Sequence, residues 1–248
     1  MHADLKRVAL VTGASSGIGA ATVRALAAAA VETISAARRV ERCEALAAEV
    51  GGRALRLDVA DPASVAALAE AVPDVDVIVH SAGGAVGLEP VADADEAAWR
   101  QMYEANVAGV VRVTKALLPA LRRGTDPQIV ILGSVAGVEA YEGGGGYTAA
   151  KHAVHALAQT LRLELLDDTI RVTEIAPGLV ETEFALVRFR GDAQRAADVY
   201  RGLEPLRAED VAELIAFCVT RPAHVDIDYA SIMPTAQATA KIARRTNA

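Results

Sequence analysis

Short runs of β-branched residues alternate with longer, alanine-rich segments along the chain, and this alternation limits the fold more than any other feature. The runs predict strands, and the segments, whose apolar residues recur at helical spacing, predict helices. Strands separated by helices need crossover connections, which produce a parallel sheet covered on both faces. We therefore expect an α/β protein with a doubly wound parallel sheet in a three-layer α/β/α arrangement.

The predicted elements leave one long segment without regular structure. Strands are expected at residues 7–12, 32–38, 53–58, 75–80, 128–134 and 170–176, with a last strand available within 224–234. Helices are expected at residues 17–30, 40–50, 62–72, 95–123, 147–166 and 207–220. Residues 181–206 fit neither pattern, as is typical of a lid or substrate loop in a compact α/β unit. We expect a single domain over residues 1–248, with a lid at about 181–206.

The composition agrees with this fold and argues against several classes of protein. Of the 248 residues, 52% are hydrophobic and 4% aromatic, which suits close packing of helices on a parallel sheet. The net charge of −7 argues against nucleic acid as a partner, because phosphate binding needs a basic face. With no run of 18 or more apolar residues and no hydrophobic signal region at the start, we expect a cytoplasmic protein without a membrane partner.

Neither the cysteines nor the paired histidines predict a metal site. Cys43 and Cys218 lack CxxC spacing, so they are expected to be free thiols in a reducing compartment. His152 and His155 have i, i+3 spacing but no third ligand in the pattern, and we expect no metal.

A glycine-rich turn joins the first predicted strand to the first predicted helix. Gly13, Gly17 and Gly19 in "VALVTGASSGIG" let the backbone approach a bound group closely. The helix that follows directs unpaired N–H groups and its positive dipole end at that group, for which a pyrophosphate is suited. The spacing is GxxxGxG, which differs from the GxGxxG dinucleotide fingerprint. The alternative is a structural turn that binds nothing.

The end of the second predicted strand indicates which dinucleotide would bind. "TISAARR" ends in Arg38 and Arg39 and has no acidic residue at its tip. A carboxylate there would accept the ribose 2′-OH of NAD, whereas a guanidinium binds the 2′-phosphate of NADP with two parallel hydrogen bonds. We expect NADP, with Arg38 as the stronger candidate because it comes first after the strand. The alternative is that the two arginines begin a solvated helix.

Further candidates follow the third and fourth predicted strands. Asp58 and Val59 could border an adenine, or Asp58 could instead cap the helix that starts near Pro62. Gly83 and Gly84 form a second tight turn after "VIVHSAGG". Because ligands in such sheets bind beyond the carboxyl ends of the strands, both glycine turns are expected to face one site.

Four residues of catalytic type are expected to converge at the same edge. Ser134 ends the fifth strand, and Tyr147 stands at the start of the next helix with Lys151 one turn later on the same face. Asn106 could add an amide from the neighbouring helix. The glycine run 143–146 precedes Tyr147; it would lie beside the substrate, where side chains would crowd the reacting carbon, or it is only a flexible loop.

Together these motifs resemble the short-chain dehydrogenase/reductase family. The resemblance covers essentially the whole chain and rests on "TGASSGIG" at 12–19, "SAG" at 81–83, Asn106, Ser134, "YTAAK" at 147–151 and "PGLVET" at 177–182. It implies a Rossmann fold, hydride transfer between a nicotinamide and a carbonyl or alcohol carbon, and a homotetramer. The coenzyme-binding residues that we expect are Gly13, Ser15, Ser16, Gly17, Ile18, Gly19, Arg38, Arg39, Asp58, Val59, Ser81, Ala82, Gly83, Asn106, Tyr147, Lys151, Pro177, Gly178, Val180 and Thr182.

The resemblance also implies roles for the catalytic residues. Tyr147 would be the general acid–base, Ser134 would hold the substrate oxygen, and Lys151 would bind the nicotinamide ribose. Asn106 would help to hold a water that leads from Lys151 to solvent. The physical argument agrees, because a phenol with a pKa of about 10 needs nearby positive charge to act as a base at neutral pH.

The chain departs from the family pattern at one motif. His80-Ser81-Ala82-Gly83 stands where the family commonly has NNAG, so the hydrogen bonds around the second glycine turn must differ. His80 either replaces one of the missing asparagines or is a hydrogen-bonded interior histidine, which we favour.

The carboxyl-terminal third is similar to a subgroup, the NADP-dependent 3-hydroxy acid dehydrogenases that act on serine and L-allo-threonine. This likeness rests on "IAPGLVETEF", "VRFRGD" and "PAHVDIDYASIMPTAQ". A carboxylate substrate would need a cation, which Arg188 or Arg190 in the lid could supply, and Arg188 is the candidate that we name. The alternative is that both arginines anchor the lid to helix carbonyls or neighbouring subunits, which suits Arg190 better. Two alternatives stay open: a reductase of larger ketones or aldehydes, and a non-catalytic NADPH-sensing protein.

Overall fold

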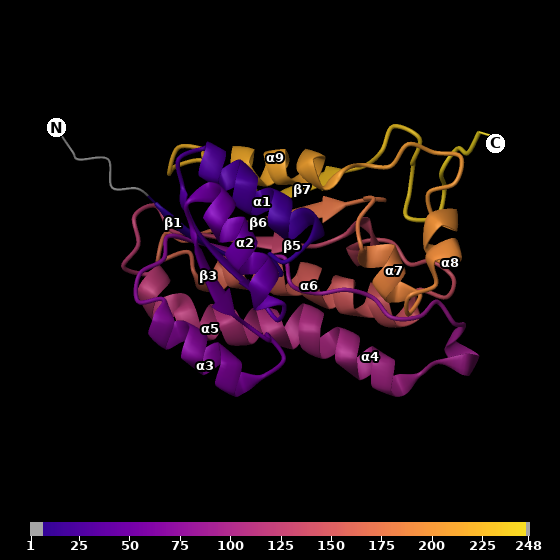
Figure 1. The fold of residues 1–248 in the computed structure, drawn as a ribbon, viewed down its shortest axis with the longest axis horizontal. Coiled ribbons are helices and arrows are strands. Elements are labelled where there is room, and N and C mark those ends of the chain that lie inside the picture. The colour runs from indigo at the N-terminus through magenta and orange to yellow at the C-terminus, as the bar shows by residue number, and fades with distance from the viewer. Residues whose placement is uncertain (1–6, 247–248) are drawn as a thin grey trace.

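The computed structural model describes residues 7–246, which form a seven-stranded parallel sheet in the order β3-β2-β1-β4-β5-β6-β7 (Figure 1). The strands are β1 (Val8–Thr12), β2 (Glu32–Ala37), β3 (Arg53–Arg56), β4 (Val77–His80), β5 (Gln128–Leu132), β6 (Arg171–Pro177) and β7 (Tyr229–Ile232). Every predicted strand is therefore confirmed, including the last. Since β1 pairs with β2 on one side and with β4 on the other, the strand order reverses between β1 and β4, where ligands bind in folds of this type.

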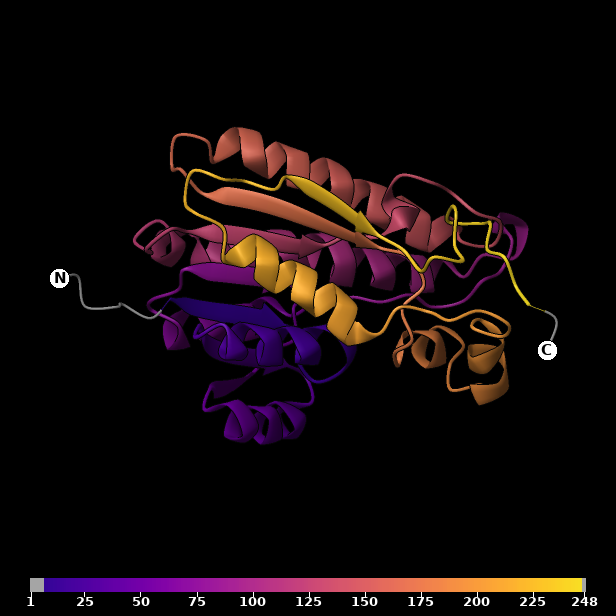
Figure 2. The ribbon, with the colours of Figure 1, turned by 90° about the horizontal axis from the view of Figure 1, so that it is seen from above.

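Helices cover both faces of the sheet, as the sequence predicts. One face carries α1 (Gly17–Ala28), α2 (Val40–Val50) and α9 (Ala208–Val219), and the other carries α3 (Pro62–Ala71), α5 (Gly109–Leu121) and α6 (Gly145–Glu164) (Figures 1 and 2). Side chains alternate across a strand, so β1 supplies Leu10 to one core and Ala9 and Val11 to the other. The result is the Rossmann-like three-layer fold.

Two predicted helices differ from the observed ones. The helix expected at 95–123 is divided into α4 (Glu96–Tyr103), a π-helix at Glu104–Ala108 and α5. The helix expected from Tyr147 begins two residues earlier, because Gly145 and Gly146 are already helical. Within the glycine run only Gly143 has a positive φ, of 72°.

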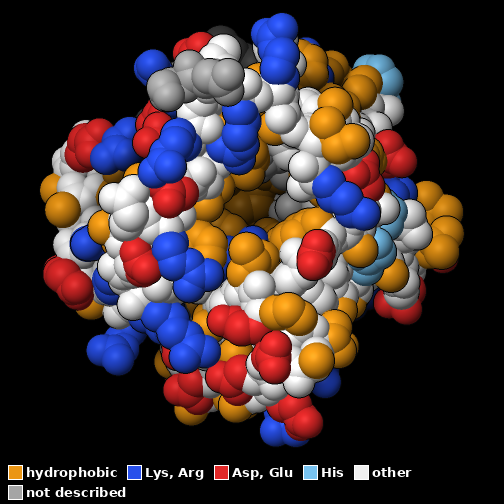
Figure 3. Space-filling model, turned by 90° about the vertical axis from the view of Figure 1, so that its right-hand side faces the viewer, with side chains coloured by type: hydrophobic (Ala, Val, Ile, Leu, Met, Phe, Trp, Pro, Cys, Tyr) orange, Lys and Arg blue, Asp and Glu red, His pale blue; other side chains and the backbone are white. Residues whose placement is uncertain are grey.

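The segment expected to be an irregular lid contains two short helices, α7 (Phe184–Arg188) and α8 (Ala193–Asp198). They lie at the end of the molecule to which the strands point with their carboxyl ends (Figures 1 and 2). Viewed from this end the surface is hollowed at its centre, with hydrophobic side chains at the bottom and charged side chains around the rim (Figure 3).

At the other end of the sheet, where the strands begin, a network of charged side chains joins several elements. Arg171, the first residue of β6, is 5% exposed and donates to both carboxylate oxygens of Asp126 at 2.8 and 3.2 Å. It also donates to the carbonyl of Cys218 at the end of α9, while Arg7 donates to the carbonyls of Asp126 and Val219. This network joins β1, β5, β6 and α9 far from the hollowed face.

Among residues 7–246, no helix is both long and apolar enough to cross a membrane.

Candidate active site

The two glycine turns pack directly against each other. Gly13 has a φ of 69°, and a Cβ there would lie 2.8 Å from the backbone of Ala82 and from the carbonyl of Ser81. A Cβ on Gly19 would lie 2.5 Å from the carbonyl of Gly13. These glycines are needed because backbone fills the space that a side chain would take.

The amino terminus of α1 is suited to an anion. Its N-cap, Ser16, makes no side-chain capping bond, and the first turn holds no acidic residue. The first N–H groups of the helix therefore have no protein partner, and the dipole adds positive potential. This arrangement fits the pyrophosphate of a dinucleotide.

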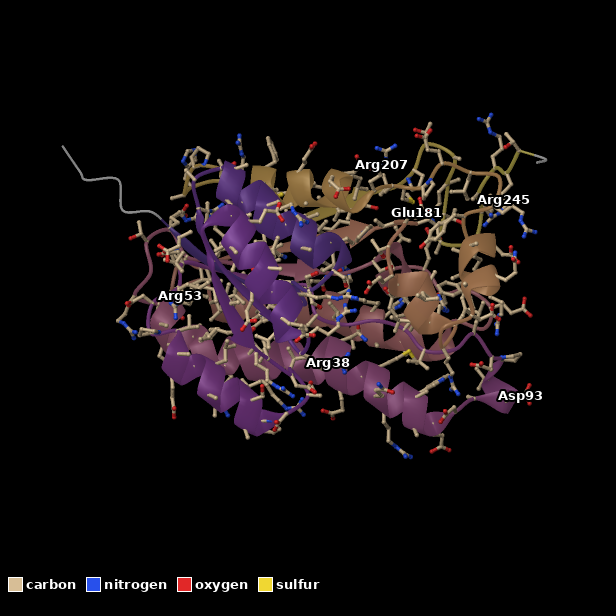
Figure 4. All side chains as sticks on the ribbon, in the orientation of Figure 1. Arg38, Arg53, Asp93, Glu181, Arg207 and Arg245 are labelled. Carbon is tan, nitrogen blue, oxygen red and sulfur yellow. The ribbon has the colours of Figure 1, made fainter. Side chains whose placement is uncertain are left out.

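Arg39, rather than Arg38, contacts the first glycine turn. Its guanidinium donates to the Oγ of Ser15 at 3.1 and 3.2 Å and to the Oγ of Ser16 at 2.8 Å. The side chain of Arg38 is exposed and makes no hydrogen bond or ion pair within the described part of the chain (Figure 4). The expectation that Arg38 is the stronger phosphate ligand stays a prediction, but the contacts favour Arg39.

A threonine and an asparagine hold the second glycine turn. The Oγ1 of Thr12 accepts from the N–H groups of Ser81 and Ala82, both at 3.1 Å. Asn106 binds the backbone of Gly84 in both directions, with its Oδ1 accepting at 3.2 Å and its Nδ2 donating at 2.9 Å. These bonds hold the second glycine turn in a chain that has His80 and Ser81 where the family pattern has asparagines.

The π-helix explains how Asn106 reaches this turn. It lies in the middle of Glu104–Ala108, is 2% exposed, and donates a further bond to the carbonyl of Met102 at 2.7 Å. A π-turn widens the helix locally and is frequent at functional sites. The continuous apolar pattern of the sequence does not reveal it.

Two side chains near these turns have structural contacts. His80 is buried, its Nε2 lies 2.9 Å from the Oγ1 of Thr114, and burial lowers its pKa to about 3. The interpretation of His80 as an interior histidine is thus confirmed. Asp58 does not cap α3, because the N-cap is Asp61; Asp58 accepts from the N–H of Ala60 instead. That alternative was wrong because α3 begins at Pro62, as expected, and the residue directly before it, Asp61, is the one whose side chain accepts from the N–H of Ala63.

Ser134, Tyr147 and Lys151 converge as the motif spacing predicts, and all three are at most 9% exposed. The Nζ of Lys151 lies 5.8 Å from the centre of the Tyr147 ring and donates to the carbonyl of Leu132 at 2.7 Å. Ser134 follows β5 and has an extended backbone conformation, and its Oγ accepts a hydrogen bond from the N–H of Ala136. Phe184, the first residue of α7, packs edge-on against Tyr147 with ring centres 5.4 Å apart.

Burial dominates the ionisation of these groups. It raises the pKa of Tyr147 above that of a free phenol, although the hydroxyl of Ser134 and the charge of Arg188 oppose the rise. Burial also lowers the pKa of Lys151 to about 8, against a smaller opposing effect of Glu174. The sequence led us to expect a lowered phenol pKa, and in the protein alone the loss of hydration outweighs the positive charge.

The "PGLVET" segment lies over the first glycine turn. A Cβ on Gly17 would lie 3.3 Å from the side chain of Thr182. Gln237, which the sequence analysis did not single out, accepts from the N–H of Leu179 at 2.8 Å and fills the space beside Gly178. Its role depends on a contact between segments 58 residues apart, which no local pattern could indicate.

The remaining expected ligands lie at or beyond the carboxyl ends of the strands. Pro177 ends β6, and Val180 forms a parallel bridge with Leu206 at the end of the lid segment. Val59 is 8% exposed and packs against Gly109, and Ile18 is partly buried in the first turn of α1.

A small cavity next to Tyr147 holds one arginine with spare hydrogen-bonding capacity. It has about 200 Å³ of empty space and is bordered by Trp99, Met102, Arg188 and the glycine run. Arg188 donates to the carbonyl of Gly87 at 3.0 Å and to the hydroxyl of Tyr141 at 2.9 Å, and its Cζ lies 5.8 Å from the centre of the Tyr147 ring. Its Nη2 is buried and has no hydrogen-bond partner among residues 7–246.

The glycine run makes room for the walls of this cavity. A Cβ on Gly146 would lie 2.6 Å from Met102 and 2.7 Å from Trp99, and a Cβ on Gly144 would lie 2.3 Å from the ring of Tyr141. The run therefore allows close packing, and the alternative of a merely tolerated flexible loop does not explain these contacts.

The other candidate cations and histidines have separate partners. Arg190 donates to Asp95, the N-cap of α4, at 3.3 Å, in agreement with an anchoring role for the lid. His152 contacts the carbonyl of Thr148, and His155 contacts Glu174. Within residues 7–246 no group of three or more His, Cys, Asp or Glu side chains could hold a metal ion.

A doubly wound sheet with such a cluster beyond its strand ends defines a class of protein, the α/β oxidoreductases. The chain belongs to the short-chain dehydrogenase family, whose family model, described as short chain dehydrogenase, matches residues 7–191.

Named relatives and a solved structure agree with this assignment. A sulfoacetaldehyde reductase of Chromohalobacter salexigens is 42% identical over 93% of this chain and 95% of its own. An NADP-dependent 3-hydroxy acid dehydrogenase of Schizosaccharomyces pombe is 41% identical over 92% of each chain. The closed form of a serine dehydrogenase complexed with NADP⁺ superposes with a TM-score of 0.90 at 35% identity, covering 97% of this chain and all of that one.

Proposed function

We propose that the protein interconverts a small 3-hydroxy acid, such as serine, allo-threonine or 3-hydroxypropionate, and the corresponding carbonyl compound with NADP(H). The observation that carries the proposal is the buried Nη2 of Arg188, which lacks a partner in the described part of the chain and belongs to a guanidinium beside Tyr147. A buried donor without a partner is costly, and an anionic substrate group would satisfy it.

The residues present fit a nicotinamide dinucleotide. The free N–H groups of α1 suit its pyrophosphate, and Arg39 suits a 2′-phosphate, with Arg38 as the second candidate. Asp58 and Val59 would border the adenine, and Pro177, Gly178, Val180 and Thr182 would hold the nicotinamide carboxamide. When bound, the coenzyme donates or accepts the hydride. The NADP named for the serine dehydrogenase and for the 3-hydroxy acid dehydrogenase supports this assignment.

The residues of the chain would supply proton transfer and positioning. Tyr147 keeps its proton at neutral pH because burial raises its pKa, so it is ready to donate to the oxygen of a carbonyl substrate. Ser134 would hold that oxygen and stabilise its developing charge. Lys151 would bind the nicotinamide ribose, and its ammonium lies close enough to the Tyr147 ring to favour the phenolate left after donation.

Asn106 would position a water rather than react. Its amide oxygen and nitrogen are engaged by Gly84 and Met102, which fix the side chain at the turn. A water held there would lead from Lys151 to solvent and return the proton to Tyr147. In the opposite reaction direction, the same groups would remove the hydroxyl proton of the substrate.

The cavity favours a small substrate over a large ketone. Apart from space open to solvent, its free volume is about 10 Å³, which is room for about one water. Trp99 and Met102 close the cavity on the side of α4. The glycine run that borders it has no side chains whose movement could enlarge it. Because a guanidinium binds carboxylates and sulfonates alike, the sulfoacetaldehyde reductase makes a short sulfonate the second candidate.

Substitution of Arg188 tests the proposal. We expect Arg188→Gln to raise KM for the acid about 100-fold, because the substrate anion loses a buried charged partner. The matched control is Arg190→Gln, which removes the same charge from the same lid and should change KM less than about threefold, since its pair with Asp95 is exposed. The readout is NADPH absorbance with 3-hydroxypropionate, serine, allo-threonine, 2-hydroxyethanesulfonate and an uncharged alcohol.

Three outcomes of this panel would contradict the proposal. Equal turnover of the uncharged alcohol would remove the anion requirement, and better turnover with NADH than with NADPH would remove the coenzyme assignment. Undiminished activity of Tyr147→Phe would remove the acid–base role of the phenol.

We also infer a homotetramer in the cytoplasm. The family resemblance supports the tetramer, and exposed apolar side chains on α4, α5 and α6, among them Tyr103, Val111 and Leu163, are available for contacts between subunits. The two buried free cysteines fit a reducing compartment. Light scattering in solution tests the assembly.

A further inference from the structure

Three charged side chains meet beside the first glycine turn. The carboxylate of Glu183 lies 2.9 Å from the Nη1 of Arg39 and 2.8 Å from the Nη1 of Arg42, one oxygen on each guanidinium. Arg39 and Arg42 come from the start of α2, whereas Glu183 comes from the lid, immediately before α7. The cluster therefore joins the coenzyme side of the cleft to the substrate lid.

Arg39 has almost no hydrogen-bonding capacity left. Of its five N–H groups, one on Nε and two on Nη2 are directed at Ser15 and Ser16, and one on Nη1 is directed at Glu183. Only the second N–H on Nη1 stays free. A phosphate that is to be held by two parallel bonds at this guanidinium would have to replace an existing partner.

Glu183 is the partner that a phosphate would replace. The hydrogen bonds from Arg42 and Arg39 lower the pKa of its carboxyl to about 2, so it is negatively charged at any working pH. A phosphate dianion and this carboxylate on the same guanidinium would repel each other. The pair is also 41–43% exposed, so its net stabilisation is small and a dianion can displace it.

Glu183 is connected to the substrate cavity through α7. Glu183 is the N-cap of α7, and Arg188 is the last residue of that helix. The carboxylate that contacts Arg39 and the guanidinium that borders the cavity therefore stand at the two ends of one short helix.

We propose that Glu183 is a specificity-determining residue for the coenzyme: its carboxylate occupies Arg39 and Arg42 in the free protein and competes with the 2′-phosphate for them. The inference rests on the proposed function, because it places the 2′-phosphate at Arg39. It follows that the protein binds NADP(H) more weakly than its two arginines would allow, and that the weakness is specific to nucleotides with a 2′-phosphate.

The test compares two nucleotides on three proteins. Titration calorimetry measures the Kd of 2′,5′-ADP and of 5′-AMP for the parent protein, Glu183→Gln and Glu181→Gln. Glu181 is the matched control, since it is an exposed carboxylate two residues away in the same segment (Figure 4). We expect Glu183→Gln to bind 2′,5′-ADP about tenfold more tightly than the parent and to bind 5′-AMP within about twofold of the parent. The salt dependence of each Kd should weaken at least as much as it does in Glu181→Gln.

The outcomes separate the inference from the function on which it rests. If the parent prefers 2′,5′-ADP over 5′-AMP but Glu183→Gln binds it no more tightly, or more weakly, competition by Glu183 is refuted while the coenzyme assignment survives. If the parent binds the two nucleotides equally, both the assignment of NADP and the inference are refuted. An equal gain in Glu181→Gln would show a general charge effect and would also overturn the proposal.

Discussion

Loss of hydration governs the ionisable residues at the centre of the site. It raises the pKa of Tyr147 and lowers that of Lys151 to about 8, and the charges of Arg188 and Glu174, respectively, oppose these shifts without cancelling them. The identities of these residues could be predicted, because the motif fixes them. The direction of the Tyr147 shift could not, because it depends on how much water Phe184 and the lid exclude, and that depends on the tertiary structure.

His80 makes a contribution to stability that depends on pH. Its pKa of about 3 in the folded state lies below the ordinary value of 6.5, so the unfolded chain takes up a proton that the folded protein does not. The stability that the neutral ring provides is complete above pH 6.5 and is lost as the pH falls towards 3. In urea unfolding, the parent should lose about 1 kcal/mol more than His80→Asn over the first pH unit below that value.

Asparagine is the appropriate replacement because the family commonly has it at this position. All other ionisable groups are the same in the two proteins, so their contributions cancel in the difference. Parallel stability profiles for the two proteins would contradict the assigned pKa of His80.

At the level of elements, two local departures from regular structure shape the site. The π-helix at Glu104–Ala108 turns Asn106 towards the second glycine turn, and the glycine run lets α6 start against α4. The sequence predicted the helices on either side of both features. It did not predict the break or the early start, because an apolar pattern continues unchanged through a π-turn and because glycine opposes a helix unless packing compensates.

Gly146→Ala tests the packing argument for the glycine run. Alanine favours a helix by about 1 kcal/mol over glycine, but overpacking costs about 1–3 kcal/mol, so we expect a net loss of about 1 kcal/mol. The loss should be visible in urea unfolding, because the Trp99 ring, which would lie 2.7 Å from the new Cβ, cannot move as freely as the end of Met102.

Gly84→Ala is the control for this substitution. It has no heavy atom within 4 Å of its Cβ position and no positive φ, so its stability should stay within about 0.5 kcal/mol of the parent. A Gly146→Ala variant more stable than the parent would show that the run is not required for packing.

In the whole molecule, the buried charged network and the candidate active site lie at opposite ends of the strands. The network of Arg171 and Asp126 lies at the edge where β6 begins, and the hollowed face lies where the strands end (Figure 3). We expect Arg171→Met to lower the free energy of unfolding by about 3 kcal/mol, because it removes the buried arginine that pairs with the carboxylate of Asp126. KM for coenzyme and substrate should not change.

The control for Arg171 is another arginine–aspartate pair. Arg122 and Asp168 form an exposed pair, with the arginine side chain 50% exposed, so Arg122→Met should cost less than about 1 kcal/mol. Chemical denaturation measures both variants. Equal losses would mean that burial of the Arg171 network contributes nothing.

The sequence predicted the layers and the parallel sheet because alternating periodicity is a local property. It did not predict α7 and α8, nor the contacts of Gln237 and Tyr141, because these depend on packing between distant segments. The contacts of Arg39 were not predicted for the same reason, because only the folded turn brings Ser15 and Ser16 to its guanidinium. The choice of Arg38 as the stronger phosphate ligand, which rests on its position after the strand, stays a prediction.

The short helix α7 carries Glu183 at its beginning and Arg188 at its end. Each residue advances a helix by about 100°, so inserting or deleting a single residue between them would rotate Arg188 away from the cavity. A longer loop after Arg190 would not change the direction in which Arg188 points from α7. Tolerance to insertions should therefore change abruptly within a few positions of the lid. Under the proposed function, a family member of different length here would need another cation to bind an anionic substrate.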